Sequence, residues 1–254
     1  MILLNQSLAW IISAITLILL EFLLYQPGVI YWVVPILVLT LFLALFQLNG
    51  RNFKDAKFWT IFLAPALFLL GSISYLVFAS GSRLLHFIII LTALVILIYT
   101  NVVFLYIHRR PRYQPHTLEN ISSYLNVITI FFLMAAIFNV RLFFVVNTWY
   151  LLLVGISIII MLVYQLFSIS DIVIRTNKLF LLIISLVISE VFIVTNFLPT
   201  SVYVNALMVT LVYYVTAGLA RNWLNGIKDK RVVLRYVSIG SIIFFIILIS
   251  AKWI

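Results

Sequence analysis

Apolar stretches of membrane length occupy almost the whole chain, and this feature most constrains what the chain can fold into. Of 254 residues, 66% are apolar and only 9% are charged, and the mean hydropathy is +1.27. A soluble domain normally has about a quarter of its residues charged. Too little polar sequence remains to cover a water-soluble core, so we expect lipid to be the solvent for much of the surface.

Nine of these stretches match the roughly 20 helical residues that cross a bilayer core of about 30 Å. They are longer than the strands of a membrane barrel and lack a strict alternation of apolar and polar residues. The sequence therefore predicts an all-α integral membrane protein, a polytopic bundle of about nine transmembrane helices that forms a single transmembrane domain over residues 1–254 without a soluble domain. The expected spans are 7–25, 28–47, 58–80, 84–107, 121–138, 145–167, 179–197, 201–222 and 236–252.

The basic residues fall between alternate stretches, and this distribution predicts an orientation. Thirteen of the 16 lysines and arginines belong to the even-numbered connections: Arg51, Lys54, Lys57, Arg109, Arg110, Arg112, Arg175, Lys178, Arg221, Lys228, Lys230, Arg231 and Arg235. The other three are Arg83, Arg141 and Lys252. Short loops rich in these residues stay in the cytoplasm. We therefore expect a multi-pass protein of the cell membrane with a cytoplasmic N-terminus and an external C-terminus.

The same distribution indicates which partners to expect. The net charge of +10 is spread over short loops, which favours contact with anionic membrane lipids and does not favour nucleic acid. Two cytoplasmic loops are long enough to be docking surfaces for a protein partner, residues 108–120 and residues 221–235. The alternative is that both loops are solvated connectors beside the lipid surface.

A weak internal similarity suggests a parallel repeat of three-helix units. The matching segments lie 172 residues apart, or 176 for the last: Ile11-Ile12-Ser13 with Ile183-Ile184-Ser185, Pro27 with Pro199, Tyr31 with Tyr203, and Leu48-Asn49-Gly50 with Leu224-Asn225-Gly226. Structural repeats are common in transporters. Chance matching between segments made of a few apolar residue types is the other explanation, and the sequence leaves both open.

Two acidic residues lie inside predicted spans, and both are candidates for function. Glu21 and Glu190 fall in the external half of the expected membrane, where the nearby cationic candidates are Arg83, Arg141 and His86. A carboxylate in hydrocarbon costs a few kcal/mol and indicates function by default. These five residues are the predicted binding site for a ligand or an ion.

Each glutamate also has a purely structural explanation. Glu21 is close enough to the end of its span to reach the interface or to pair with an arginine. Glu190 is deeper, and its structural alternatives are an ion pair between helices or a protonated acid that hydrogen-bonds to a neighbour. We expect no metal, because the three histidines lack the close spacing of a metal site, and no cofactor.

Known catalytic motifs are absent from the sequence. It contains no HExxH, GxSxG, Walker or GxGxxG pattern, and it has no cysteine. We therefore favour a small transporter, or a membrane-embedded subunit of a larger assembly, with a polar site in the external half of the membrane. The alternatives are a scaffold, or an enzyme that acts on a lipid-linked or lipid-phosphate substrate at the external leaflet. In that enzyme Arg83 and Arg141 would hold phosphate, and Glu190 or Glu21 would be the general base.

Overall fold

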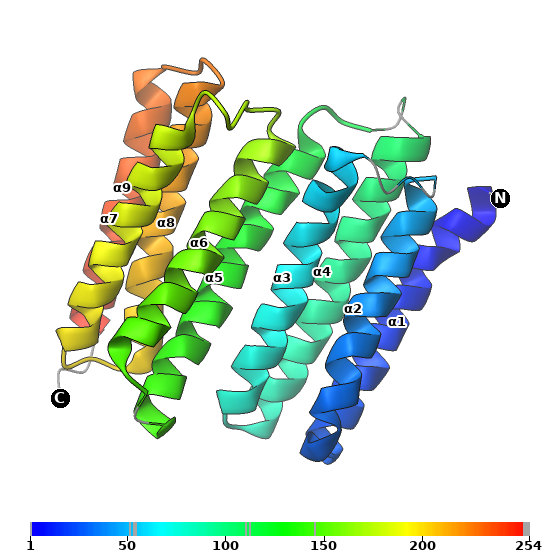
Figure 1. The fold of residues 1–254 in the computed structure, drawn as a ribbon, viewed down its shortest axis with the longest axis horizontal. Coiled ribbons are helices and arrows are strands. Elements are labelled where there is room, and N and C mark those ends of the chain that lie inside the picture. The colour runs from blue at the N-terminus through cyan, green and yellow to red at the C-terminus, as the bar shows by residue number, and fades with distance from the viewer. Residues whose placement is uncertain are drawn as a thin grey trace. The chain divides into compact units, whose positions relative to one another are not determined.

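The structure, a computed structural model, describes residues 2–50, 52, 55–109, 111, 113–144 and 146–250. Arg51, Lys54, Arg110, Arg112 and Lys252, which contribute to the predicted orientation, lie outside these ranges. The described chain is helical throughout (Figure 1). Its elements are α1 (Ile2–Tyr25), η1 (Pro27–Val29), α2 (Ile30–Leu48), α3 (Ala56–Phe78), α4 (Ser82–His108), α5 (Thr117–Phe144), α6 (Thr148–Ile169), α7 (Lys178–Phe197), α8 (Val202–Leu224) and α9 (Lys230–Ser250).

All nine α-helices of the described ranges are long and apolar enough to cross a membrane. This confirms the predicted all-helical class and the expected nine helices of membrane-spanning length within the described ranges. Several helices extend beyond their predicted ends, α5 and α9 among them. α5 continues to Phe144, past the predicted end at residue 138, and Asn139 in this extension donates to the carbonyl of Ala135 at 2.8 Å. α9 begins six residues early, at Lys230, because Asp229 caps it and accepts a hydrogen bond from the Arg231 amide at 2.9 Å.

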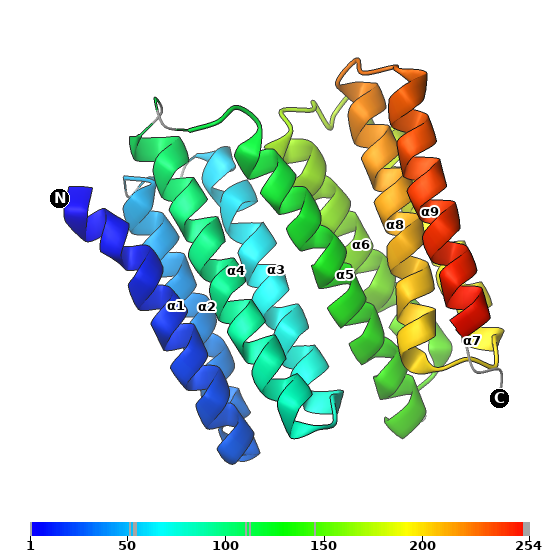
Figure 2. The ribbon, with the colours of Figure 1, turned by 180° about the vertical axis from the view of Figure 1, so that it is seen from behind.

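The chain divides into two compact units, residues 1–125 and residues 126–254. Each is described by itself below, and the single domain expected from the sequence stays a prediction. In unit 1, α1 packs most extensively against α4 and also contacts α2, while α3 contacts both α2 and α4 (Figures 1 and 2). α3 is the most buried of these helices, with 67% of its apolar window inside the protein.

A proline in the centre of unit 1 explains one of its contacts. Pro65 lies inside α3 and has no backbone N–H, so the carbonyl of Ile61, four residues earlier, loses its partner within the helix. The hydroxyl of Tyr99 on α4 donates to this carbonyl at 2.8 Å, and Tyr99 is fully buried. A neighbouring helix thus completes the hydrogen bonding that the proline interrupts, as apolar surroundings require.

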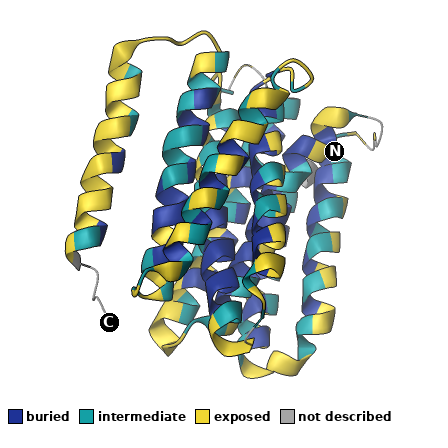
Figure 3. Cartoon of the chain, turned by 60° about the vertical axis from the view of Figure 1, so that its left-hand side comes forward, coloured by how far each residue is buried: buried dark blue, intermediate teal, exposed yellow. Residues whose placement is uncertain are grey.

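In unit 2, successive helices α6, α7, α8 and α9 pack side by side, and α5 adds contacts to α6 and α7. The rings of Phe138 on α5 and Phe192 on α7 stack with centroids 5.0 Å apart. α9 packs on α8 and is otherwise open: only 11% of its apolar window is buried, and Figure 3 shows this helix, which leads to the C-terminus, exposed along most of its length.

Two glycines allow α9 to approach α8. A Cβ atom at Gly218 would overlap the ring of Tyr236, and one at Gly240 would come within 2.7 Å of the Val215 side chain. Small residues let helix backbones come close, which is the usual basis of helix association in lipid. The attachment of α9 therefore depends on a narrow seam of small residues rather than on a broad buried face.

We predict that Tyr99→Phe lowers the free energy of unfolding by about 1–3 kcal/mol, because the Ile61 carbonyl becomes buried without a donor. The loss should be smaller in a Pro65→Ala background, where the new amide at position 65 can bond to Ile61 within the helix. Titration of the purified protein with a denaturing detergent measures both. Tyr124→Phe is the matched control, because the Tyr124 side chain is exposed. Equal losses of unfolding free energy in the two backgrounds would show that the Tyr99 hydroxyl does not compensate for the missing amide of Pro65.

Candidate functional site

The structure brings two of the five predicted site residues together in unit 1. Nδ1 of His86 lies 3.0 Å from Oε1 of Glu21, which joins the last turn of α1 to the start of α4. The His86 side chain is 43% exposed and that of Glu21 is 27% exposed, so the pair is only partly shielded. A carboxylate and an imidazole at this distance can share, hold or pass a proton.

Arg83 does not join this pair. It lies one turn before His86 on α4 and its side chain is exposed. Within the described chain, no hydrogen bond or ion pair of Arg83 is found. The exposed arginine therefore does not neutralise Glu21 in this structure.

Arg141 has an amide partner in unit 2. Its Nη1 atom donates to the backbone carbonyl of Asn196 at 3.0 Å and also to the Asn196 side-chain oxygen. Asn196 in turn donates to the Phe192 carbonyl at 2.6 Å. This contact joins the last turns of α5 and α7 and occupies the guanidinium that the sequence suggested for Glu190.

Glu190 is exposed on α7, seven residues before the end of the helix. The large apolar side chains one turn away on either side, Leu186 and Val194, are each 59% exposed. Among the described residues, none forms a hydrogen bond or an ion pair with Glu190. Its carboxylate is therefore an isolated acid on an apolar helix surface.

A buried polar cluster in unit 2 was not predicted. Asn126 on α5 donates to Gln165 on α6 at 2.7 Å and to the Leu162 carbonyl at 3.3 Å. Both amide side chains are fully buried, and so is Tyr213 on α8, whose hydroxyl lies beside Asn126. The hydroxyl and the Asn126 amide oxygen lack hydrogen-bond geometry here, but as donor and acceptor they can pair after a small rotation. The signal in the sequence is a pair of neutral amides, Asn126 and Gln165, deep inside apolar spans.

The predicted docking loop at residues 108–120 is partly ordered by its own side chains. The Leu118 amide donates to the Tyr113 hydroxyl at 2.9 Å, and His116 Nδ1 lies 2.9 Å from Glu119 Oε1. Burial raises the pKa of Tyr113 above its usual value, so this phenol stays protonated at neutral pH. These contacts shape the start of α5, which begins at Thr117, four residues before the expected span.

No three histidine, aspartate or glutamate side chains gather at one point in the described ranges. Comparisons of the chain with models of known protein families, with curated proteins and with solved structures find no match. The functional argument therefore depends on the side chains described above. They provide a carboxylate–imidazole pair, an isolated carboxylate and a neutral amide pair that links α5 to α6.

We predict that Asn126→Leu lowers the free energy of unfolding by about 1–3 kcal/mol, because the buried Gln165 loses its donor. Adding Gln165→Leu should recover part of that loss, since removing both amides leaves neither member of this hydrogen-bonded pair without the other. Unfolding in denaturing detergent measures the cycle, and Gln26→Leu, at an exposed glutamine, is the control. If the double variant loses as much as both single variants together, the amides do not act as a unit.

Proposed function

We propose that this chain is a multi-pass membrane protein without covalent chemistry, either a small transporter or the membrane-embedded subunit of a larger assembly. Its polar site lies in the external half of the membrane, and Glu190 is its central group. The observation that carries this proposal is the exposed carboxylate of Glu190 on the apolar surface of α7.

The position of Glu190 within its predicted span makes an uncompensated carboxylate costly in free energy. Seven helical residues place it about 10 Å from the end of α7, which is far for a short side chain to reach the interface. An acidic residue near the centre of a span costs about 2.5–3.5 kcal/mol on insertion scales. Arg141, one of the cations that the sequence suggested for this site, donates instead to Asn196.

Glu190 has no partner among the described residues, and we propose that a cation or a group on another chain compensates its carboxylate. A cation that binds and leaves would make the carboxylate a transport site. A donor on another protein chain would make it an assembly site. The Glu21–His86 pair supports the transport version, because it adds a second proton-holding site in the same half of the predicted membrane.

We propose further that α1–α3 and α7–α9 form a parallel repeat. The helix boundaries support this: α1 and α7 both end two residues before the matching prolines, and α2 and α8 both begin three residues after them. α2 and α8 also end at the same Leu-Asn-Gly sequence, and Gly50 and Gly226 adopt φ of 67° and 79°, which glycine tolerates best. In such a repeat Glu21 and Glu190 would lie on equivalent first helices, about one turn apart.

The enzyme hypothesis gains no support from the described contacts. It requires Arg83 and Arg141 to converge on one phosphate beside a carboxylate. Arg141 instead donates to the Asn196 carbonyl and amide oxygen. We therefore retain the transporter or subunit as the proposal.

The reactivity of Glu190 tests the proposal. Apolar carbodiimides modify protonated carboxyl groups in lipid, so we expect dicyclohexylcarbodiimide to label Glu190 in proteoliposomes, detected by peptide mass spectrometry. If Glu190 binds a transported cation, that cation should slow the labelling, and Glu190→Gln should abolish cation or proton flux. If it binds another subunit, labelling should be blocked in the assembly and recovered when the chain is purified alone.

Asp55 is the control for this experiment, because it caps α3 in a loop and accepts a hydrogen bond from the Lys57 amide at 2.9 Å. It should not react with the apolar reagent. Labelling of Glu190 that neither cations nor assembly change, together with unaltered flux and assembly in Glu190→Gln, would contradict the proposal.

The proposed orientation has a separate test. The chain has no cysteine, so single cysteines report without background. Exposed positions on opposite sides are Gln26 and Ser80, which we expect outside, and Arg175 and Lys230, which we expect in the cytoplasm. An impermeant thiol reagent on intact cells should label the first two variants and spare the last two. The reverse pattern would invert the orientation, and a mixed pattern would contradict the alternation.

A further inference from the structure

An apolar slot opens between three helices at one end of unit 2. It is a cavity of about 340 Å³, and nearly all of its wall is hydrocarbon. Its walls include Ile184 and Val187 of α7, Leu219 and Trp223 of α8, Ile227 of the following loop and Val233 of α9. The slot lies where α7 begins, α8 ends and α9 begins.

The packing of α9 explains why the slot exists. α9 leans on α8 through Gly218 and Tyr236, whereas α7 and α9 are not among the helix pairs that pack extensively in the described part of unit 2. The outer side chains Ile183, Trp223 and Val233 are between 43% and 52% exposed, so the slot opens on the surface that would face lipid.

Three cations lie between the wall residues Ile227 and Val232 in the sequence. Lys228, Lys230 and Arg231 are exposed, and Nζ of Lys228 lies 4.8 Å from the centroid of the Trp223 ring, which is itself part of the wall. Asp229 is the one acid between α8 and α9, and its side chain accepts from the Arg231 amide as a helix cap. Within the described residues, no ion pair neutralises these three cations.

We infer that this slot binds one anionic phospholipid, with an acyl chain between α7, α8 and α9 and the phosphate at Lys228 and Arg231. A wall made almost entirely of hydrocarbon suits an acyl chain. The volume of the cavity is at the lower end of the roughly 300–1,000 Å³ typical of ligand sites. Uncompensated cations beside it match a negative headgroup at the membrane surface. Trp223, in the last turn of α8, lies between the hydrocarbon wall and Lys228, and aromatic side chains are enriched at membrane interfaces.

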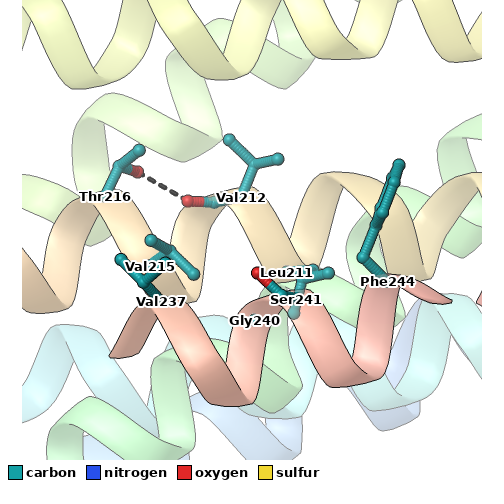
Figure 4. Close-up of a pocket in the computed structure, with 8 residues that line it drawn as sticks. All are labelled: Leu211, Val212, Val215, Thr216, Val237, Gly240, Ser241 and Phe244. Carbon is teal, nitrogen blue, oxygen red and sulfur yellow. Dashed lines mark hydrogen bonds between the residues drawn. The ribbon is translucent and has the colours of Figure 1, made fainter. Parts of the chain in front are cut away.

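A second cavity in the same unit provides an internal comparison. It measures about 270 Å³ and lies along the α8–α9 seam, where Leu211, Val215, Gly240 and Phe244 contribute to its lining (Figure 4). No charged residue lines it. We expect hydrocarbon chains to cover it without selecting a headgroup.

The test measures lipid retained by the full-length protein. The purified chain is mixed in mild detergent with equal phosphatidylglycerol and phosphatidylcholine of identical acyl chains, and bound lipid is identified by native mass spectrometry. We expect the wild type to retain phosphatidylglycerol preferentially. Lys228→Gln with Arg231→Gln should reduce this retention about thirtyfold, at roughly 1 kcal/mol for each surface cation. Ile183→Trp should fill the slot and reduce retention of both lipids.

Matched controls separate a site from general attraction. Lys57→Gln with Arg109→Gln removes two described cations of unit 1, and Val237→Trp fills the second cavity; neither should change the preference. Lys228→Arg with Arg231→Lys, which keeps both charges, should retain it. The inference is overturned if wild type binds both lipids equally, or if the unit 1 variant loses as much as the Lys228 and Arg231 variant.

Discussion

The hydrogen-bonding needs of the backbone in apolar surroundings underlie the rest of this structure. A helix satisfies nearly all of its own N–H and C=O groups, which is why a chain so poor in polar residues is helical throughout its described part. Pro65 breaks this rule within α3, and Tyr99 on α4 restores it by donating to the freed Ile61 carbonyl. The positions of α3 and α4 are therefore coupled through a single buried hydroxyl.

The ionisable and amide side chains follow the same rule with different outcomes. Glu21 on α1 pairs with His86 on α4, and the side-chain amide of Asn126 on α5 donates to Gln165 on α6. Glu190 has no hydrogen-bond or ion-pair partner within the described chain, and for this reason the proposed function centres on it. A polar group that remains unpaired on an apolar surface costs free energy, so it persists where a proton, an ion or a partner compensates it.

The small residues of the α8–α9 seam set a second constraint. Gly218 admits the Tyr236 ring, so α9 attaches by a narrow contact and leaves the slot beside α7 open. Three of the basic residues that predict the orientation, Lys228, Lys230 and Arg231, lie beside wall residues of this slot in the sequence. The same cations that indicate the orientation thus lie near the apolar wall of the slot. In the inferred lipid site they select the headgroup.

The sequence by itself determined the helical class and the number of helices of membrane-spanning length in the described chain, because each follows from the length of uninterrupted apolar segments. It also singled out Glu21 and His86 as members of one candidate site, and only the tertiary structure decided that they touch. Tertiary structure also assigned Arg141 to Asn196, left Glu190 exposed, and joined Asn126 to Gln165. These outcomes depend on the rotation of each helix about its axis, and helices that are apolar on every face carry almost no sequence signal for that rotation.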